Sequence, residues 1–153
     1  MYKIGKFKTK EELSFYRKYH SPNASNLNSV KADCIFINKS EKKGYTKEHE
    51  LMKFELAWEA RGMGDHFITE GARSATEIER EIFKVKKEKV IDFVNISQQQ
   101  EYEIIHKHES DKQIKYYRDN GIIPIIVGET IICEICNQKY PKRNKGNVCH
   151  NCK

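Results

Sequence analysis

The sequence predicts an α/β domain that is followed by a small cysteine-rich module. The chain has 153 residues, which is the size of one ordinary domain with small appendages. Between residues 47 and 127, segments with helical periodicity alternate with short β-branched segments. Four of the five cysteines lie near the C-terminal end. We therefore expect a basic extension of undetermined fold over residues 1–46, an α/β core over 47–130 and the cysteine module over 131–153.

The first element of the predicted core is a helix over residues 47–61. Its apolar residues recur at the i, i+3, i+6 and i+7 positions of one helical face, namely Leu51, Phe54, Ala57 and Trp58. We expect this stripe to face the core, with Glu50 on the inward side of the helix. Gly62 and Gly64 then end the helix.

Capping and turn residues predict the remaining elements. Ser74 or Thr76 could cap a helix, although the residues that follow also fit a strand. Ser110 caps a later helix, Gly121 ends it, and Pro124 marks the strand after it as an edge or bulged strand. In chain order we expect a strand at 34–37, a strand at 66–69, a helix or strand within 74–88, a hairpin with strands at 90–96 and 101–108, a helix at 111–120 and a strand at 122–127.

Charge and composition limit the function. The 28 Lys and Arg residues exceed the 22 Asp and Glu residues, for a net charge of +6 and a pI near 9.0, which fits a polyanionic partner. No apolar run reaches the roughly 18 residues of a membrane span, and the N-terminus lacks the apolar stretch of a signal peptide. We therefore expect a cytoplasmic protein, in which paired cysteines are reduced and bind metal.

The spacing of the four C-terminal cysteines predicts a zinc site. Cys133-x-x-Cys136 and Cys149-x-x-Cys152 are separated by twelve residues, as in the two knuckles of a zinc ribbon. Four thiolates fill the tetrahedral shell of Zn²⁺ and leave no open position, so the metal is structural. The module has almost no apolar core, so metal binding must supply its folding free energy. The fifth cysteine, Cys34, is predicted to be a core residue.

The loop between the two knuckles is basic. It contains no acidic residue, and a tyrosine lies among its cations. Such a loop can neutralise phosphates and stack on a base, although zinc ribbons also serve as structural staples or protein contacts. The candidate nucleic-acid-binding residues are Lys139, Tyr140, Lys142, Arg143 and Lys145.

The predicted hairpin brings two carboxylates together. A two-residue loop at 97–98 sets Asp92 directly opposite Glu103, and a four-residue loop at 97–100 leaves them diagonal on the same face. An acid within an apolar strand is costly to bury unless it is paired. A divalent cation such as Mg²⁺ or Mn²⁺, which prefers oxygen ligands, would relieve the repulsion between the two groups.

A third acid could join this pair. Glu50 lies on the inward side of the first helix, and Glu70 follows the strand at 66–69. Both also have an ordinary explanation, because a glutamate favours a helix N-terminus and a loop glutamate is normally solvated.

The order of these elements and acids resembles the PD-(D/E)xK nuclease superfamily, in particular archaeal Holliday-junction resolvases and CoiA-like competence proteins. The resemblance covers residues 48–127 and implies a restriction-endonuclease-like fold, in which a mixed central sheet is flanked by helices. It also implies Mg²⁺-dependent hydrolysis of DNA phosphodiesters, with Asp92 and Glu103 as metal ligands and Glu50 or Glu70 as the upstream acid.

The sequence departs from this family at the catalytic lysine. Ile105 occupies the position two residues after Glu103, so Lys107 or Lys112 would have to replace the lysine. The resulting expectation is a DNA endo- or exonuclease that acts on double-stranded or branched DNA and uses its zinc ribbon to hold the nucleic acid. A homodimer is left open. The alternative is a nucleic-acid-binding protein without enzymatic activity, built from the same ribbon and a basic α/β body.

Overall fold

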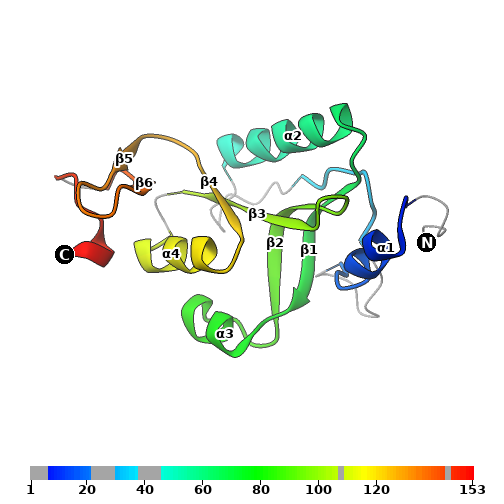
Figure 1. Ribbon diagram of the computed structural model, residues 1–153, viewed down its shortest axis with the longest axis horizontal. Helices are drawn as coiled ribbons and strands as arrows, with labels where there is room; N and C mark the ends of the chain where they lie inside the picture. Colours follow the sequence, from blue (N-terminus) through cyan, green and yellow to red (C-terminus); the bar gives the residue numbers. More distant parts are fainter. Residues whose placement is uncertain (1–6, 22–29, 38–45, 107–108, 144–145) are drawn as a thin grey trace.

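The fold is a mixed α/β structure, described here from a computed structural model over residues 7–21, 30–37, 46–106, 109–143 and 146–153 (Figure 1). Four helices and six strands occur in these ranges, with one short 3-10 helix at the C-terminal end. In chain order they are α1 (Lys10–Tyr16), α2 (Lys47–Gly62), β1 (Phe67–Ser74), α3 (Glu77–Phe83), β2 (Glu88–Asn95), β3 (Gln100–Ile105), α4 (Asp111–Asp119), β4 (Ile123–Ile126), β5 (Thr130–Ile132), β6 (Lys139–Pro141) and η3 (His150–Cys152).

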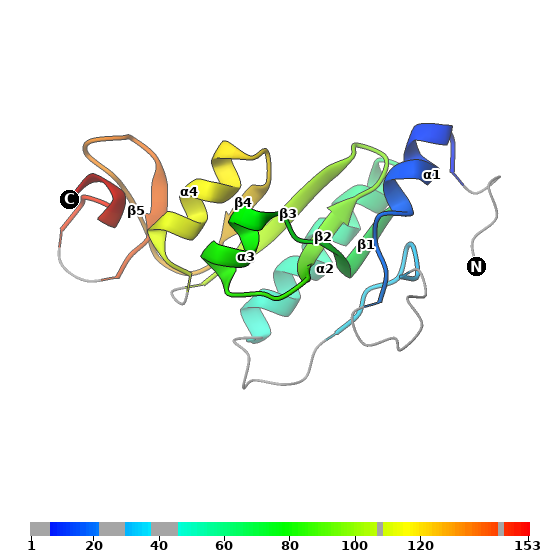
Figure 2. The same cartoon turned by 90° about the horizontal axis from the view of Figure 1, so that it is seen from below.

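The larger sheet has the strand order β1-β2-β3-β4. Strands β1, β2 and β3 form an antiparallel meander, whereas β4 returns through α4 to lie parallel to β3. Helix α2 covers one face of this sheet, and α1, α3 and α4 lie on the other face (Figures 1 and 2). A second sheet of β5 and β6 belongs to the cysteine module.

Local capping explains where the helices begin. The side chain of Thr76 accepts a hydrogen bond from the backbone N–H of Glu79, and Glu79 reaches back to the N–H of Thr76. This capping box makes the ambiguous segment 74–88 begin as helix α3. Ser110 forms the same kind of box at α4, as its sequence predicts, and Gly121 follows that helix with a φ of 73°. Pro124 lies in β4, an edge strand of the sheet, where a missing donor is tolerated.

The described part of the N-terminal extension belongs to the core. Phe7, Leu13 and Tyr16 on and beside α1 pack against Ile68 and Val94 of the sheet. The expected strand at 34–37 is wrong, since residues 34–37 form no strand, and Cys34 is half-buried rather than a full core residue. Among the described residues, no helix is long and apolar enough to cross a membrane.

Helix α2 has the predicted bounds but the opposite orientation. The expected inward stripe is wrong at Leu51, Phe54 and Trp58, which are exposed, whereas its fourth residue, Ala57, is buried as predicted. The buried face instead carries His49, Lys53, Ala57 and Ala60. The two alanines pack against Phe67 and Phe93, whose rings fill the space beneath the helix. Small side chains at this contact let the helix backbone approach the sheet closely, and the charged residues follow them onto the inner face.

Candidate zinc centre and acidic site

The four C-terminal cysteines form the predicted metal centre. Their sulfur atoms all lie within 4.8 Å of one another, and Cys136 Sγ is 3.9 Å from Cys149 Sγ. Tetrahedral zinc–thiolate geometry, with bonds of ~2.3 Å, requires sulfurs roughly 3.8 Å apart. All five cysteines are free thiols in this structure. The donor set therefore fits a four-thiolate zinc ion.

Backbone hydrogen bonds shape the two knuckles. The sulfur of Cys133 accepts the N–H groups of Ile135 and Cys149, both at 3.4 Å. The backbone N–H of Cys136, with smaller contributions from those of Cys149 and Ile135, lowers the pKa of the Cys133 thiol to about 6 against the opposing effect of burial, which favours the thiolate that binds metal. Asn137 adopts a left-handed conformation with a φ of 60° at the end of the first knuckle. Asparagine tolerates this conformation well, which suits Asn137 to the turn that follows Cys136.

One aspartate makes several of the contacts that attach the zinc module to the α/β core. Asp111, at the start of α4, accepts hydrogen bonds from the guanidinium of Arg143 at 3.0 Å and from the backbone N–H of His150 at 2.8 Å. Its own backbone carbonyl accepts a bond from Asn151 at 2.8 Å. Tyr140 and two of the cysteines pack into the same apolar cluster as Tyr117 of α4. The module is therefore built onto the core.

These contacts revise the predicted nucleic-acid-binding loop. Tyr140 is buried, so its ring cannot stack on a base in this structure, and Arg143 is engaged by Asp111. Lys139 and Lys142 are exposed, and Lys142 forms only a long ion pair of 3.6 Å with Glu129. Lys145 lies outside the described residues. Burial of a ring under α4 cannot be recognised from a loop sequence alone.

The predicted acids lie on four different elements of the core. Glu50 comes from α2, Glu70 from β1, Asp92 from β2 and Glu103 from β3. The register of the hairpin places the last two opposite each other, because Phe93 pairs with Tyr102 and the next pair is Asp92 with Glu103. The loop that achieves this has four residues, 96–99, rather than the two at 97–98.

A break in strand alternation turns two of the acids toward α2. Glu70 has a left-handed φ of 51° within β1, and the pairing with β2 skips Glu70 and Asp92. Ile91 and Val94 then pack in the same cluster, although regular alternation would put them on opposite faces. Asp92 and Val94 therefore do not share a face, as regular alternation along β2 would require. Backbone strain of this kind is uncommon for a non-glycine residue and is often found at functional sites.

Asp92 and Glu103 lie in the gap between β2 and β3. Glu103 Oε1 accepts the backbone N–H of Asp92 at 3.0 Å, and Asp92 Oδ2 accepts the N–H of Ile104 at 2.9 Å. The carboxylates thus replace the ladder bonds that the two strands would otherwise exchange. This exchange fixes both side chains at the point where the strands separate.

Three cations neutralise the acids. Lys53, whose side chain is 0% exposed, lies 2.6 Å from Glu50 and 3.2 Å from Glu70, and it also donates to the carbonyl of Phe36 at 2.8 Å. His49 Nε2 lies 3.2 Å from Asp92 Oδ2. Lys89 Nζ lies 3.6 Å from Glu103 Oε2, which also accepts the hydroxyl of Tyr117 at 3.4 Å.

Burial sets the protonation of this cluster. Burial raises the pKa of the Glu103 carboxyl to about 8, against the opposing effect of the Lys89 ammonium and with the added repulsion of Asp92. Burial by itself lowers the pKa of His49, but its hydrogen bond to Asp92 and the charges of Asp92 and Glu50 outweigh that effect and raise it. The site therefore binds protons more tightly than isolated side chains would.

The acids have the ligand chemistry that a divalent cation requires, but their ligand atoms are not spaced closely enough around one point. Carboxylate oxygens are suitable ligands for Mg²⁺, and Asp92 and Glu103 are in direct contact. Within the described residues, however, the cysteines are the only group of three or more ligand atoms that all lie within 4.8 Å of one another. Protein cations now occupy the positions around the acids.

Sequence reasoning missed the three cations. Lys112, one of the two expected replacements for the family lysine, is exposed on α4, and Lys107 lies outside the described residues. The signal for His49 and Lys53 was their i, i+4 spacing in line with the alanines of α2. Hydrophobic periodicity does not indicate this stripe, because its residues are small or charged.

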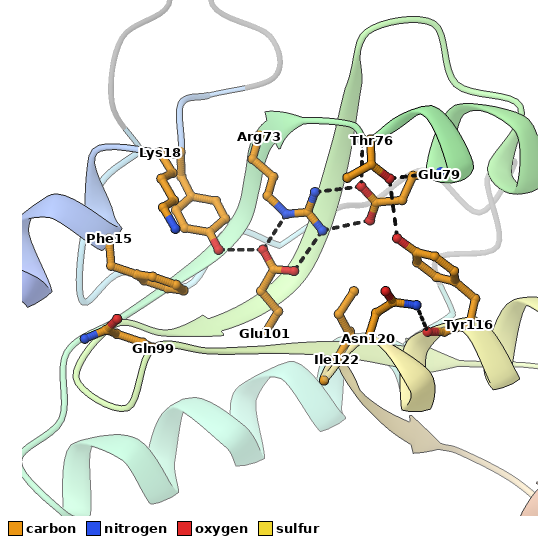
Figure 3. A pocket seen from close by; sticks show the side chains of 12 residues that line it. Phe15, Lys18, Arg73, Thr76, Glu79, Gln99, Glu101, Tyr116, Asn120 and Ile122 are labelled. Atoms are coloured by element: carbon orange, nitrogen blue, oxygen red, sulfur yellow. Dashed lines mark hydrogen bonds and ion pairs between the residues drawn. The ribbon is translucent and has the colours of Figure 1, made fainter.

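A pocket of about 340 Å³ lies among α1, α3 and α4, on the face of the sheet opposite α2 (Figure 3). At its centre, Arg73 donates to both oxygens of Glu79, at 2.8 Å each, and to both oxygens of Glu101, at 2.6 and 2.9 Å. Its guanidinium also reaches the carbonyl of Ser74 at 3.1 Å. These bonds use all five donors of the guanidinium, so the network is a structural cross-link and offers no donor of Arg73 to a ligand.

Comparisons with known proteins found no relative of this chain. No protein-family model, curated protein or solved structure matches the chain.

The four-cysteine site predicts that replacing one of its cysteines releases the metal. The purified protein should contain one zinc per chain by elemental analysis. Cys149→Ser should release it and lower the midpoint of thermal unfolding, because the module depends on the metal for its folding free energy. Cys34→Ser should retain the zinc. Full zinc content in Cys149→Ser would contradict the assignment.

The raised pKa of Glu103 predicts a dependence of stability on pH. Between about pH 4.5 and pH 8 the folded state holds a proton that the unfolded state has lost, so rising pH should lower the free energy of unfolding. The loss is roughly 1.4 kcal/mol for each pH unit over which this difference persists. Urea denaturation at several pH values should show that the free energy of unfolding falls less steeply with pH in Glu103→Gln than in the original protein. Identical slopes would contradict the raised pKa.

Removal of the Lys53 charge should destabilise the fold. Lys53→Met leaves Glu50 and Glu70 buried without their cation, which should cost about 3–5 kcal/mol in urea denaturation. The exposed Lys112→Met serves as the control and should change stability by less than about 0.5 kcal/mol. Adding Glu50→Gln and Glu70→Gln to Lys53→Met should recover part of the loss. If Lys53→Met matched the control, the ion cluster would not stabilise the fold.

Proposed function

We propose that the acidic cluster is the active site of a metal-dependent deoxyribonuclease with a restriction-endonuclease-like core. The supporting observation is that α2, β1, β2 and β3 each contribute one acid to a single region, within an α-β-β-β-α-β arrangement whose last strand runs parallel to β3. The short helix α3 is inserted between β1 and β2. This is the arrangement that the resemblance to the PD-(D/E)xK superfamily implies.

Asp92 and Glu103 are the proposed ligands of Mg²⁺ or Mn²⁺. When bound, such an ion supplies positive charge for the developing charge on the phosphate and activates water. Glu50 or Glu70 is the upstream acid, and each is held by Lys53. Glu103 is largely protonated at neutral pH, so its proton must leave before the carboxylate can bind a cation.

Lys53 and Lys89 are the proposed replacements for the family lysine. Ile105, at the family position, is buried against α4 and carries no charge. Among the described residues, Lys53 and Lys89 are the lysines that form ion pairs with the four acids. They reach the acids from α2 and β2. The site would therefore have a lysine charge, although not from the position two residues after Glu103 that the family uses.

The zinc module is the proposed accessory for DNA. Lys139 and Lys142 are exposed on it, and the chain as a whole has a charge of +6. Contacts of this kind neutralise phosphates without reading sequence, so they would hold the duplex or a branched junction while the acidic site acts.

A binding protein without enzymatic activity is the second candidate. It is favoured by the observation that every acid of the cluster already has a protein cation or backbone donor as a partner. In this case the cluster is a structural ion network, and DNA or RNA binding resides in the zinc module and the basic surface.

Nuclease assays with matched variants separate the two candidates. Asp92→Asn and Glu103→Gln should each lower Mg²⁺-dependent cleavage of linear and branched DNA by ~100-fold or more, since loss of a ligand exceeds the 10–100-fold effect of its outer partners. The exposed carboxylate variant Asp119→Asn should cleave normally. Salt-sensitive binding with no cleavage by the original protein would favour the second candidate, and equal cleavage by all variants would exclude these residues from catalysis.

A further inference from the structure

The outer face of α2 is an exposed apolar stripe. Leu51, Phe54 and Trp58 are 53%, 50% and 69% exposed, and they follow the i, i+3, i+7 spacing of a helix contact surface. The rings of Phe54 and Trp58 stack with their centroids 6.2 Å apart. Single exposed apolar residues are common, but an ordered stripe of three large ones on one helix indicates an interaction surface.

The stripe is large enough for the centre of an interface. At their measured exposures, Leu51, Phe54 and Trp58 present on the order of 400 Å² of apolar surface. A standard interface buries ~800 Å² per partner, of which a little more than half is apolar. The stripe therefore supplies most of the apolar area that such an interface needs, and the charged residues beside it on α2 can form the polar rim.

We propose that the α2 stripe is the interface of a homodimer with twofold symmetry, in which the two α2 helices pack antiparallel. A twofold interface must be complementary to itself. If Leu51 of one copy faces Trp58 of the second, the two Phe54 rings meet at the axis. Three residues further toward each end, Glu48 then faces Arg61 of the second copy. Both of these charged residues are exposed, so the arrangement joins an apolar centre to opposite charges at both rims.

The inner face of the same helix holds the acidic site, so dimerisation leaves that site uncovered by the partner. His49 and Lys53 point to the sheet, while the stripe points away from it. The dimer is thus independent of the proposed activity: it would form equally in a nuclease or in a binding protein.

Tryptophan fluorescence and sedimentation provide the test. Trp58 is the single tryptophan of the chain, so the emission reports on the stripe alone. On dilution of the full-length protein from micromolar to nanomolar concentration, the emission maximum should move to longer wavelength as Trp58 becomes exposed. Sedimentation equilibrium should give the mass of a dimer over the concentrations at which the emission is at shorter wavelength.

Variants assign the effect to the stripe. Phe54→Glu places a charge at the axis and should weaken dimerisation by at least about 30-fold, the effect of losing an interface hot spot. Its far-UV circular dichroism should be unchanged, because the side chain is exposed in the monomer. Ile78→Glu, an equally exposed isoleucine on α3, should dimerise like the original protein. A protein that sediments as a monomer at 100 micromolar, or a Phe54→Glu variant that still dimerises, would overturn the proposal.

Discussion

The interior position of Lys53 is the constraint on which the central part of the structure depends. An ammonium group with no solvent exposure is tolerated only when it is paired, and here two carboxylates and a carbonyl surround it. These partners come from α2, β1 and the segment before α2. The pairing therefore sets the rotation of α2 about its axis, the left-handed turn at Glu70 and the position of Phe36. The same rotation directs the large apolar residues of α2 to the outside.

A comparable polar contact joins the zinc module to the core. Asp111 is nearly inaccessible, and its oxygens accept hydrogen bonds from the guanidinium of Arg143, the backbone N–H of His150 and the side-chain amide of Asn151. Asp111 is also the first residue of α4, so these hydrogen bonds hold the second knuckle in a fixed position relative to that helix. Zinc binding would then order residues that pack directly on Tyr117, and Tyr117 in turn contacts Glu103. The metal module and the acidic site share this connection through α4.

Much of the fold could be predicted because its signals are local. The caps at Thr76 and Ser110, the edge proline at Pro124 and the two cysteine knuckles act within a few residues of themselves. The meeting of the hairpin acids could also be predicted, since any hairpin loop with an even number of residues places Asp92 and Glu103 on the same face. The rotation of α2 was not predictable in this way. Its most hydrophobic face is the exposed one, and only the ion pairs beneath it explain why.

The residue types and spacings alone determined that four cysteines form a zinc-type centre and that two acids meet across a hairpin. Tertiary structure decided which partners those groups have: Lys53, His49 and Lys89 around the acids, and Asp111 beneath the zinc module. The reason is that a cap, a turn or a metal knuckle is completed by neighbours in the chain, whereas the neutralisation of a buried charge depends on segments that meet only when the chain has folded. The four C-terminal cysteines are the clearest case of the first kind, and Lys53 is the clearest case of the second.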